Sequence, residues 1–186
     1  AEYQVRHMKW WGWGDEDVTF SDADKPKLWP YLGGELGLEE GVPVPPVSFE
    51  EINLPAAKTN LPFTAALKGA LKADQISEDK KDRLIHAAGK AFRDLLRLRR
   101  GQVDYAPDLS VYPSNEDDVV AIIKAANEHD AVIIPFGGGT NIAGCLEPKD
   151  RNGRFIESLD MWRMNRVLSV DKKSLIARIQ AGVYGP

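Results

Sequence analysis

The sequence contains one cysteine, no long apolar run and no long basic run, and each absence excludes a class of protein. Cys145 is the only cysteine among the 186 residues. A single cysteine excludes an internal disulfide and is typical of a reducing compartment. No segment approaches the roughly 18 apolar residues of a membrane-spanning helix, and residues 1–14 lack the apolar core of a signal peptide. We therefore expect a soluble protein of the cytosol or of an organelle.

Charge and histidine content argue against two kinds of site. The 24 basic and 28 acidic residues give a net charge of −4, and no basic block is longer than RLRR at residues 97–100. Nucleic-acid binding needs a basic patch, so we expect no nucleic-acid partner. His7, His86 and His129 lack the spacing of metal ligands, so we expect no metal site.

The N-terminal part differs in composition from the rest of the chain. Most of the prolines and tryptophans lie in residues 10–64, which favours turns and extended segments that cover another surface. Trp10, Trp11 and Trp13 are interpreted as a core or interface anchor, and a lipid-facing surface is the alternative.

From Ser77 onward the pattern becomes helical. Apolar residues recur at helical spacing and Gly101 follows a basic last turn, so we expect one amphipathic helix of about six turns over residues 77–100. Its core-facing residues are Leu84, Ile85, Ala88, Phe92, Leu95 and Leu96. The basic last turn is interpreted as a solvated helix end, favoured by the helix dipole, rather than as a phosphate or membrane contact.

The remainder predicts an α+β fold in the order strand, helix, strand, glycine-rich loop and β-meander. A strand at 109–113 precedes a helix that begins at a capping box from Ser114 to Asp117 and ends by Asp130. A buried strand is expected at 131–136, followed by strands at 153–160, 166–170 and 174–183, the last two joined by a turn at 171–173. The core-facing helix positions are Val119, Val120, Ile122, Ile123 and Ala126.

The sequence VIIPFGGGTN at residues 132–141 ends a strand in three consecutive glycines. A Rossmann fingerprint would need a third glycine where Ile142 stands, and a Walker loop would need Lys followed by Ser or Thr where the chain has Cys145 and Leu146. Both motifs place phosphate at a helix N-terminus, whereas Pro148 does not favour a following helix.

The remaining interpretation of this glycine-rich loop, residues 137–141, is a backbone nest that binds an anion. Consecutive N–H groups without Cβ atoms can surround a phosphate, and Thr140 and Asn141 add side-chain donors. A valine at Gly138 is then expected to block the phosphate and to forbid a positive φ. The alternative is that the glycine-rich loop is only a tight turn between secondary-structure elements and binds no ligand.

The sequence resembles a known flavoprotein family. PDLSVYPSNEDDVVAIIKAANEHDAVIIPFGGGTN and SLDMWRMNRVLSVDKKSLIARIQAGVYGP are similar to the first half of the PCMH-type FAD-binding domain of the vanillyl-alcohol oxidase superfamily. VRHMKWWGWGDEDVTF and RLIHAAGKAFRDLLRLRRGQVDYAPDLSVYP are similar to the alkyldihydroxyacetonephosphate synthase family. The resemblance implies a family-specific segment over residues 1–103 and a truncated FAD-binding domain over residues 104–186.

The resemblance also implies a function. Members of the synthase family exchange the fatty acyl chain of acyl-dihydroxyacetone phosphate for a long-chain fatty alcohol in ether-lipid synthesis, with FAD as an electrophile. One alternative is an FAD-linked oxidoreductase of the D-lactate or glycolate dehydrogenase type, from which the sequence MKWWGWG distinguishes this chain. The other alternative is a non-catalytic module. The expected location is cytoplasmic, or peroxisomal in an animal. A peripheral membrane contact and a homodimer are further possibilities that the resemblance allows.

The resemblance places the FAD diphosphate against the glycine-rich loop. The implied cofactor-binding residues are Pro135, Phe136, Gly137, Gly138, Gly139, Thr140 and Asn141. No histidine follows the glycines, so FAD is expected to be non-covalent, and the catalytic residues are expected beyond residue 186. Cys145 has no basic neighbour in sequence to activate it, so we expect it to pack in an apolar setting.

Overall fold

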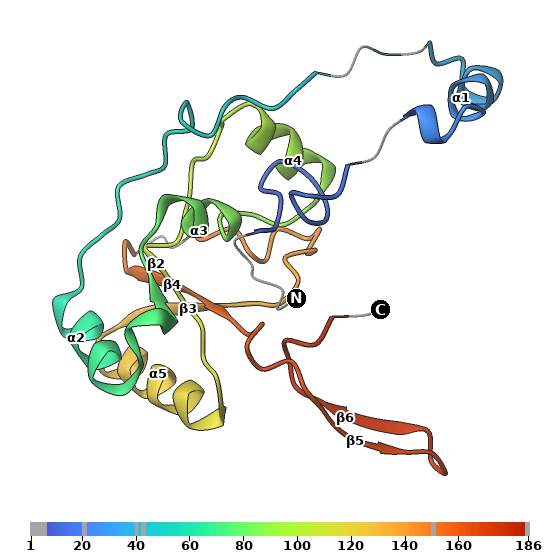
Figure 1. Cartoon of the computed structure of the whole chain (residues 1–186). Helices are drawn as coiled ribbons and strands as arrows, with labels where there is room; N and C mark the ends of the chain where they lie inside the picture. Colours follow the sequence, from blue (N-terminus) through green and yellow to red (C-terminus); the bar gives the residue numbers. More distant parts are fainter. Residues whose placement is uncertain (1–6, 20–21, 40, 42–43, 150–151, 185–186) are drawn as a thin grey trace.

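The structure is a computed structural model that describes residues 7–19, 22–39, 41, 44–149 and 152–184. These residues form a four-stranded sheet, a separate two-stranded hairpin and helices on both faces of the sheet (Figure 1). The strands are β1 (Ile76–Ser77), β2 (Leu109–Val111), β3 (Ala131–Phe136), β4 (Phe155–Asp160), β5 (Val167–Asp171) and β6 (Ile176–Ile179). The α-helices are α1 (Leu28–Leu36), α2 (Leu61–Ala70), α3 (Lys80–Ile85), α4 (Phe92–Arg99) and α5 (Glu116–Glu128). The predicted α+β fold class is confirmed.

The central sheet has the strand order β1-β2-β4-β3. β4 lies between β2 and β3 and is parallel to both, whereas β1 is antiparallel to β2 at one edge. All residues of β4 are buried. The predicted buried strand at 131–136 is β3, but most of its residues are only partly buried because β3 is the other edge strand, a position that tolerates Pro135.

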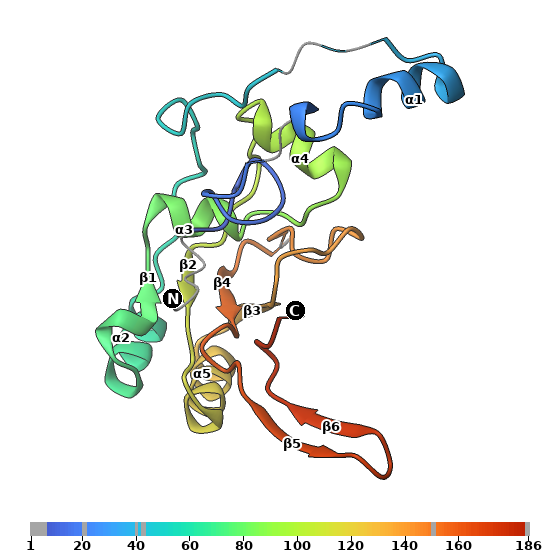
Figure 2. The ribbon, with the colours of Figure 1, turned by 45° about the vertical axis from the view of Figure 1, so that its right-hand side comes forward.

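Helices cover the two faces of the sheet separately. α2 and α5 pack together on one face, and α3 packs against β2 on the other (Figures 1 and 2). Alternation along β2 directs Leu109 and Val111 toward α2 and α5 and Ser110 toward α3. The core under α2 and α5, here the α5-side core, also contains Phe63, Leu67, Ile122, Phe155 and Leu159. The core under α3, here the α3-side core, contains Met8, Trp10, Leu84, Ile85, Tyr112, Phe136 and Leu146.

The tryptophan cluster is divided between core and surface. Trp10 is only 4% exposed in the α3-side core, and Trp11 packs edge-on against it with ring centroids 5.2 Å apart. Trp13 is 59% exposed. The predicted core anchor is therefore confirmed for Trp10, and Trp13 lies outside the core.

The predicted single helix over residues 77–100 is wrong. Two helices, α3 and α4, occupy this region, and residues 86–91 between them are not helical. The break has a tertiary cause, because the backbone at Gly89 lies against the glycine-rich loop, and a Cβ there would sit 1.9 Å from the Asn141 carbonyl oxygen. α4 ends as predicted at Gly101, whose φ is 70°.

The start of α5 differs by one residue from the predicted capping box. Asn115 is the N-cap, and its Oδ1 accepts a hydrogen bond from the Asp118 N–H at 2.9 Å. The Asp118 Oδ2 in turn accepts from the Ser114 N–H at 2.8 Å. The reciprocal chemistry of a capping box is present, but Asn115 and Asp118 supply the side chains instead of Ser114 and Asp117.

Fewer apolar residues of α4 and α5 are buried than their helical spacing predicts. Ile122 and Ala126 on α5 are buried as predicted. Val120 and Ile123 on α5 are 48% and 52% exposed, and Phe92 on α4 is 77% exposed. Among the described elements, α5 makes most of its contacts with α2 and β3, so only a narrow stripe of its surface is covered.

The predicted β-meander is only partly observed. β5 and β6 form the expected antiparallel hairpin, with a turn at residues 172–175 because β5 extends to Asp171. β4 does not join them and instead enters the central sheet. The hairpin projects from the body of the molecule, and every residue of both strands is exposed (Figure 1).

Helix α1 lies apart from the sheet and its covering helices (Figures 1 and 2). None of its residues is buried. Among the described residues, no helix combines the length and the apolar character that crossing a membrane requires.

Candidate functional site

The glycine-rich loop leaves the carboxyl end of β3. Since β2, β3 and β4 are parallel, their carboxyl ends meet at one edge of the sheet. In open α/β sheets ligands bind at this edge, where loops rather than strands carry the contacts. The structure therefore puts the predicted loop at a position suited to a ligand.

The loop backbone has the features of an anion nest. Gly139 has a left-handed φ of 66°, and a Cβ there would lie 2.6 Å from Cζ of Phe136. Within the described part of the chain, the backbone N–H groups of Gly137, Gly138, Gly139 and Thr140 donate to no protein acceptor. Free donors beside a left-handed residue are the arrangement that binds phosphate oxygens.

Gly138 differs from what the sequence predicted. Its φ is not in the left-handed region, and a Cβ there would meet the Tyr184 ring at 3.0 Å. The Tyr184 hydroxyl also donates to the Gly137 carbonyl oxygen at 3.4 Å. Burial, assisted by the negative charges of Asp160 and Asp15, raises the pKa of Tyr184 to about 12. Tyr184 is thus a neutral hydroxyl that closes one side of the loop.

The other predicted site residues divide into those that face outward and those that support the loop. Thr140 and Pro135 are exposed. The Asn141 Oδ1 accepts hydrogen bonds from the N–H groups of Ala143 and Cys145, both at 3.0 Å, so this oxygen shapes the loop. Phe136 is 1% exposed, so its side chain supports the loop from beneath and does not reach a ligand.

A buried histidine–aspartate pair lies below the loop, and no motif in the sequence indicates it. His86 Nε2 is 2.8 Å from Asp160 Oδ2, and His86 Nδ1 is 2.7 Å from the Asp82 carbonyl oxygen. The Ser110 Oγ lies 3.2 Å from the same Nδ1. Ser110, His86 and Asp160 are the residue types of a hydrolytic triad, but all three are at most 2% exposed and no substrate can reach the hydroxyl.

Lys90 connects the region of the loop to the N-terminal segment. Its Nζ donates to the Lys9 carbonyl oxygen at 2.7 Å, and its backbone N–H donates to the Asn141 carbonyl oxygen at 2.9 Å. Burial lowers the pKa of the Lys90 amine to about 8. Residues that are far apart in sequence thus meet behind the glycine-rich loop.

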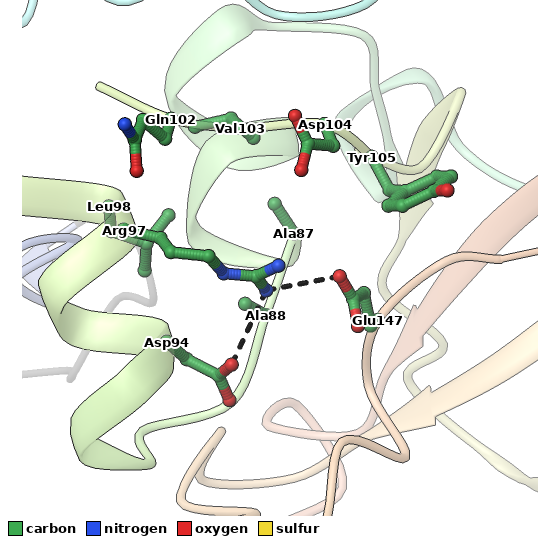
Figure 3. Close-up of a pocket in the computed structure, with 10 residues that line it drawn as sticks. All are labelled: Ala87, Ala88, Asp94, Arg97, Leu98, Gln102, Val103, Asp104, Tyr105 and Glu147. Carbon is green, nitrogen blue, oxygen red and sulfur yellow. Dashed lines mark hydrogen bonds and ion pairs between the residues drawn. The ribbon is translucent and has the colours of Figure 1, made fainter. Parts of the chain in front are cut away.

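A small pocket beside α4 is closed by an ion-pair cluster and is separate from the loop (Figure 3). The Arg97 guanidinium lies between Asp94 and Glu147, at 3.4 Å and 3.0 Å. Burial opposes ionisation of Glu147, but hydrogen bonds from Lys149 and Arg97 outweigh it and lower the Glu147 pKa. The predicted solvated end of the helix is therefore wrong for Arg97, because its ion pair with Glu147 connects α4 to the segment that follows the loop.

Glu157 is a buried carboxyl group on the face of the sheet that α2 and α5 cover. Glu157, in the centre of β4, is 0% exposed, and neither carboxylate oxygen has a hydrogen-bond partner among the residues that the structure describes. Its register neighbours are Leu109 on β2 and Ile133 on β3, which belong to or pack against the α5-side core. Burial raises the pKa of Glu157 to about 8, so the group is predominantly neutral at pH 7.

Cys145 does not pack in an apolar setting as the sequence predicted, because its side chain is exposed. We expect replacement of Cys145 by alanine to change the free energy of unfolding by less than about 0.5 kcal/mol, as for other exposed positions. Cofactor retention should also be unchanged, since only the backbone N–H of Cys145 is used in the loop. Thermal unfolding and flavin absorbance of the variant check this, and loss of bound flavin would contradict it.

No group of His, Cys, Asp and Glu side chains in the described residues could hold a metal ion. The loop site consists of backbone donors, a positive-φ glycine and a buried support.

Comparison with known proteins shows which proteins this chain resembles. Residues 107–186 match the family model described as FAD binding domain. Alkyldihydroxyacetonephosphate synthase of Dictyostelium discoideum is 38% identical over 100% of this chain and 35% of its own length. A solved structure of alkyldihydroxyacetonephosphate synthase has a TM-score of 0.85 and 36% identity, covering 98% of this chain and 38% of that chain.

The chain is a homologue of the alkyldihydroxyacetonephosphate synthases. It spans about a third of the length of the Dictyostelium synthase. Glycolate oxidase subunit GlcD of Bacillus subtilis is also similar, at 31% identity, but over 58% of this chain. The synthase match thus extends along the N-terminal segment as well as along the FAD binding domain.

Proposed function

We propose that the chain forms the diphosphate-binding part of an FAD-dependent alkyldihydroxyacetonephosphate synthase. The reaction exchanges the fatty acyl chain of acyl-dihydroxyacetone phosphate for a long-chain fatty alcohol. The observation that carries the proposal is the synthase match along the whole chain, including residues 1–103, at 38% identity. A cytoplasmic or peroxisomal location and a peripheral membrane contact belong to the same proposal.

The loop residues fit a diphosphate. The free N–H groups of residues 137–140 would donate to its oxygens, and the exposed Thr140 hydroxyl can add a further donor. A Cβ at Gly137 would have no protein atom within 4 Å, which leaves space for a ligand to approach the backbone. When bound, FAD would supply an electrophilic ring system that holds the substrate, while the protein orients both and excludes water.

Replacing Gly137 with valine tests this placement sharply. A Cβ at Gly137 would meet no protein atom within 4 Å and Gly137 has no left-handed φ, so the fold should be kept. If the diphosphate lies against the loop, the valine should raise the dissociation constant for FAD by about tenfold or more, equivalent to about 1.4 kcal/mol. Titration of apo-protein with FAD by fluorescence quenching measures this.

A matched control is Gly69→Ala on α2, where a Cβ also meets nothing within 4 Å and the position is far from the loop in sequence. It should bind FAD like the wild type. Full FAD loading of Gly137→Val at the wild-type affinity would contradict the proposed site.

The competing function is an FAD-linked oxidoreductase, which the similarity to glycolate oxidase subunit GlcD supports. The full-length protein should convert palmitoyl-dihydroxyacetone phosphate and hexadecanol to the ether product. Reduction of an artificial dye by D-lactate or glycolate, without ether formation, would instead assign it to the oxidoreductases.

A further inference from the structure

Residues 86–90, in the break between α3 and α4, contact the glycine-rich loop at both of its ends. Before the loop, the His86 ring packs on Phe136 with ring centroids 4.1 Å apart. At its end, the Lys90 N–H donates to the Asn141 carbonyl oxygen at 2.9 Å, and Gly89 lies directly against the same oxygen. One short segment therefore holds the start and the end of the loop.

His86 is itself fixed by hydrogen bonds at both ring nitrogens. The Asp82 carbonyl oxygen, 2.7 Å from Nδ1, can only accept, so Nδ1 carries a proton. Nε2 and Asp160 Oδ2, 2.8 Å apart, share a second proton. The other oxygen of Asp160 accepts from the Trp162 N–H at 2.9 Å, which fixes the carboxyl group in turn. The imidazole therefore cannot turn without breaking a buried hydrogen bond.

The contact continues from His86 to the left-handed glycine. Phe136 packs against the His86 ring and also lies under Gly139, where a Cβ would be 2.6 Å from its Cζ. A shift of the Phe136 ring would therefore displace Gly139 and redirect the N–H groups around it. Anion binding by a nest depends on donors that already point to a common centre.

We propose that His86 and Asp160 are positioning residues for the cofactor phosphates. They hold Phe136, and through it Gly139, in the conformation that directs the loop N–H groups toward the diphosphate. Neither residue touches the cofactor, because both are buried beneath the loop. The inference rests on the proposed FAD site.

Variants of the full-length protein separate positioning from general stability. His86→Phe keeps a ring on Phe136 but removes both hydrogen bonds, and Asp160→Leu leaves His86 Nε2 without its partner. Each should raise the dissociation constant for FAD by about tenfold or more. Asp160→Asn can still accept from Trp162 and hydrogen-bond to Nε2, so its FAD affinity should stay within about threefold of the wild type. FAD titration and thermal unfolding of each apo-protein are the measurements.

Phe63→Leu is the matched control, because Phe63 is fully buried in the α5-side core on the opposite face of the sheet. It should lower the melting temperature and leave FAD affinity unchanged. If His86→Phe does not fold, Phe136→Leu tests the same contact and should weaken FAD binding with the His86–Asp160 pair intact.

The outcomes distinguish the two proposals. Wild-type FAD affinity in His86→Phe or in Phe136→Leu, together with weak binding in Gly137→Val, would overturn the positioning role alone. Weak binding by Phe63→Leu in proportion to its lost stability would also overturn it. Wild-type affinity in Gly137→Val would instead overturn the FAD site on which the inference rests.

Discussion

Replacing Glu157 with methionine should stabilise the protein by about 2–4 kcal/mol at pH 7. The wild-type carboxyl group is fully buried among the apolar neighbours that its position in β4 imposes, and no described residue forms a hydrogen bond with it. Holding it neutral at pH 7 with a pKa of about 8, against 4.5 for an ordinary glutamate, costs about 3 kcal/mol at 1.36 kcal/mol per pH unit. Methionine has a similar length and no charge to desolvate. Urea denaturation of both proteins measures the difference.

The stabilisation should depend on pH in a defined direction. Because the folded pKa is raised, the folded state binds more protons than the unfolded state between pH 4.5 and about 8. The contribution of Glu157 to stability is therefore greatest below pH 4.5 and falls as the pH rises through this window. The advantage of Glu157→Met over the wild type should grow by about 3 kcal/mol from pH 5 to pH 7.5.

Two controls separate burial from charge. Glu128→Gln removes a carboxylate from an exposed position on α5 and should change little at any pH. Glu157→Gln should abolish the pH dependence but stabilise less than methionine, because a buried amide still lacks partners. A Glu157→Met variant that is less stable than the wild type at pH 7 would show that the carboxyl group has a partner in solution.

Replacing Gly89 with alanine should destabilise the protein by about 3 kcal/mol and abolish tight FAD binding. The new Cβ would lie 1.9 Å from the Asn141 carbonyl oxygen, a backbone atom that cannot move independently of the loop. Relief of this overlap must separate residues 86–90 from the loop and break the hydrogen bond from the Lys90 N–H. Thermal unfolding and FAD titration measure the two effects.

The same glycine-to-alanine change at Gly69, where the added Cβ has free space within α2, provides the comparison. It should be neutral or stabilising by up to about 1 kcal/mol, because alanine favours the helical conformation. If Gly89→Ala unfolds with the wild-type midpoint and still binds FAD, the contact between Gly89 and the loop does not exist in solution.

Local chemistry explains what the sequence predicted well. The glycine-rich loop follows a β-branched strand, and three consecutive glycines mark a backbone that must approach something closely, so its position was predicted without knowledge of the fold. The hairpin of β5 and β6 and the end of α4 at Gly101 depend on equally local signals. The cofactor contacts of the loop remain a prediction, as does the boundary between residues 103 and 104.

The features that the sequence did not predict depend on contacts between residues far apart in the chain. His86 and Asp160 are 74 positions apart, and a single histidine in an apolar helical pattern has no feature that reveals its partner. The break at residues 86–91 depends on Asn141, so helical periodicity alone predicted a continuous helix. Small residues in HAAGKA were the available signal, because glycine inside a helical pattern often marks close backbone approach. Gly138 was misjudged because the left-handed conformation falls on Gly139.

The central position of β4 determines when the sheet can be completed during synthesis. β2 and β3 emerge from the ribosome before β4, but they do not pair with each other and must leave a gap one strand wide. The hydrogen bonds that β4 forms when it fills this gap come late, for example the one that the Ile156 N–H donates to Asp108 Oδ2, 48 positions earlier. Until then both strands present unpaired edges to other nascent chains, a recognised route to aggregation. The arrival of Phe155–Asp160 should therefore be the step that commits the chain to its fold, and ribosome-bound chains that end before residue 155 should remain protease-sensitive.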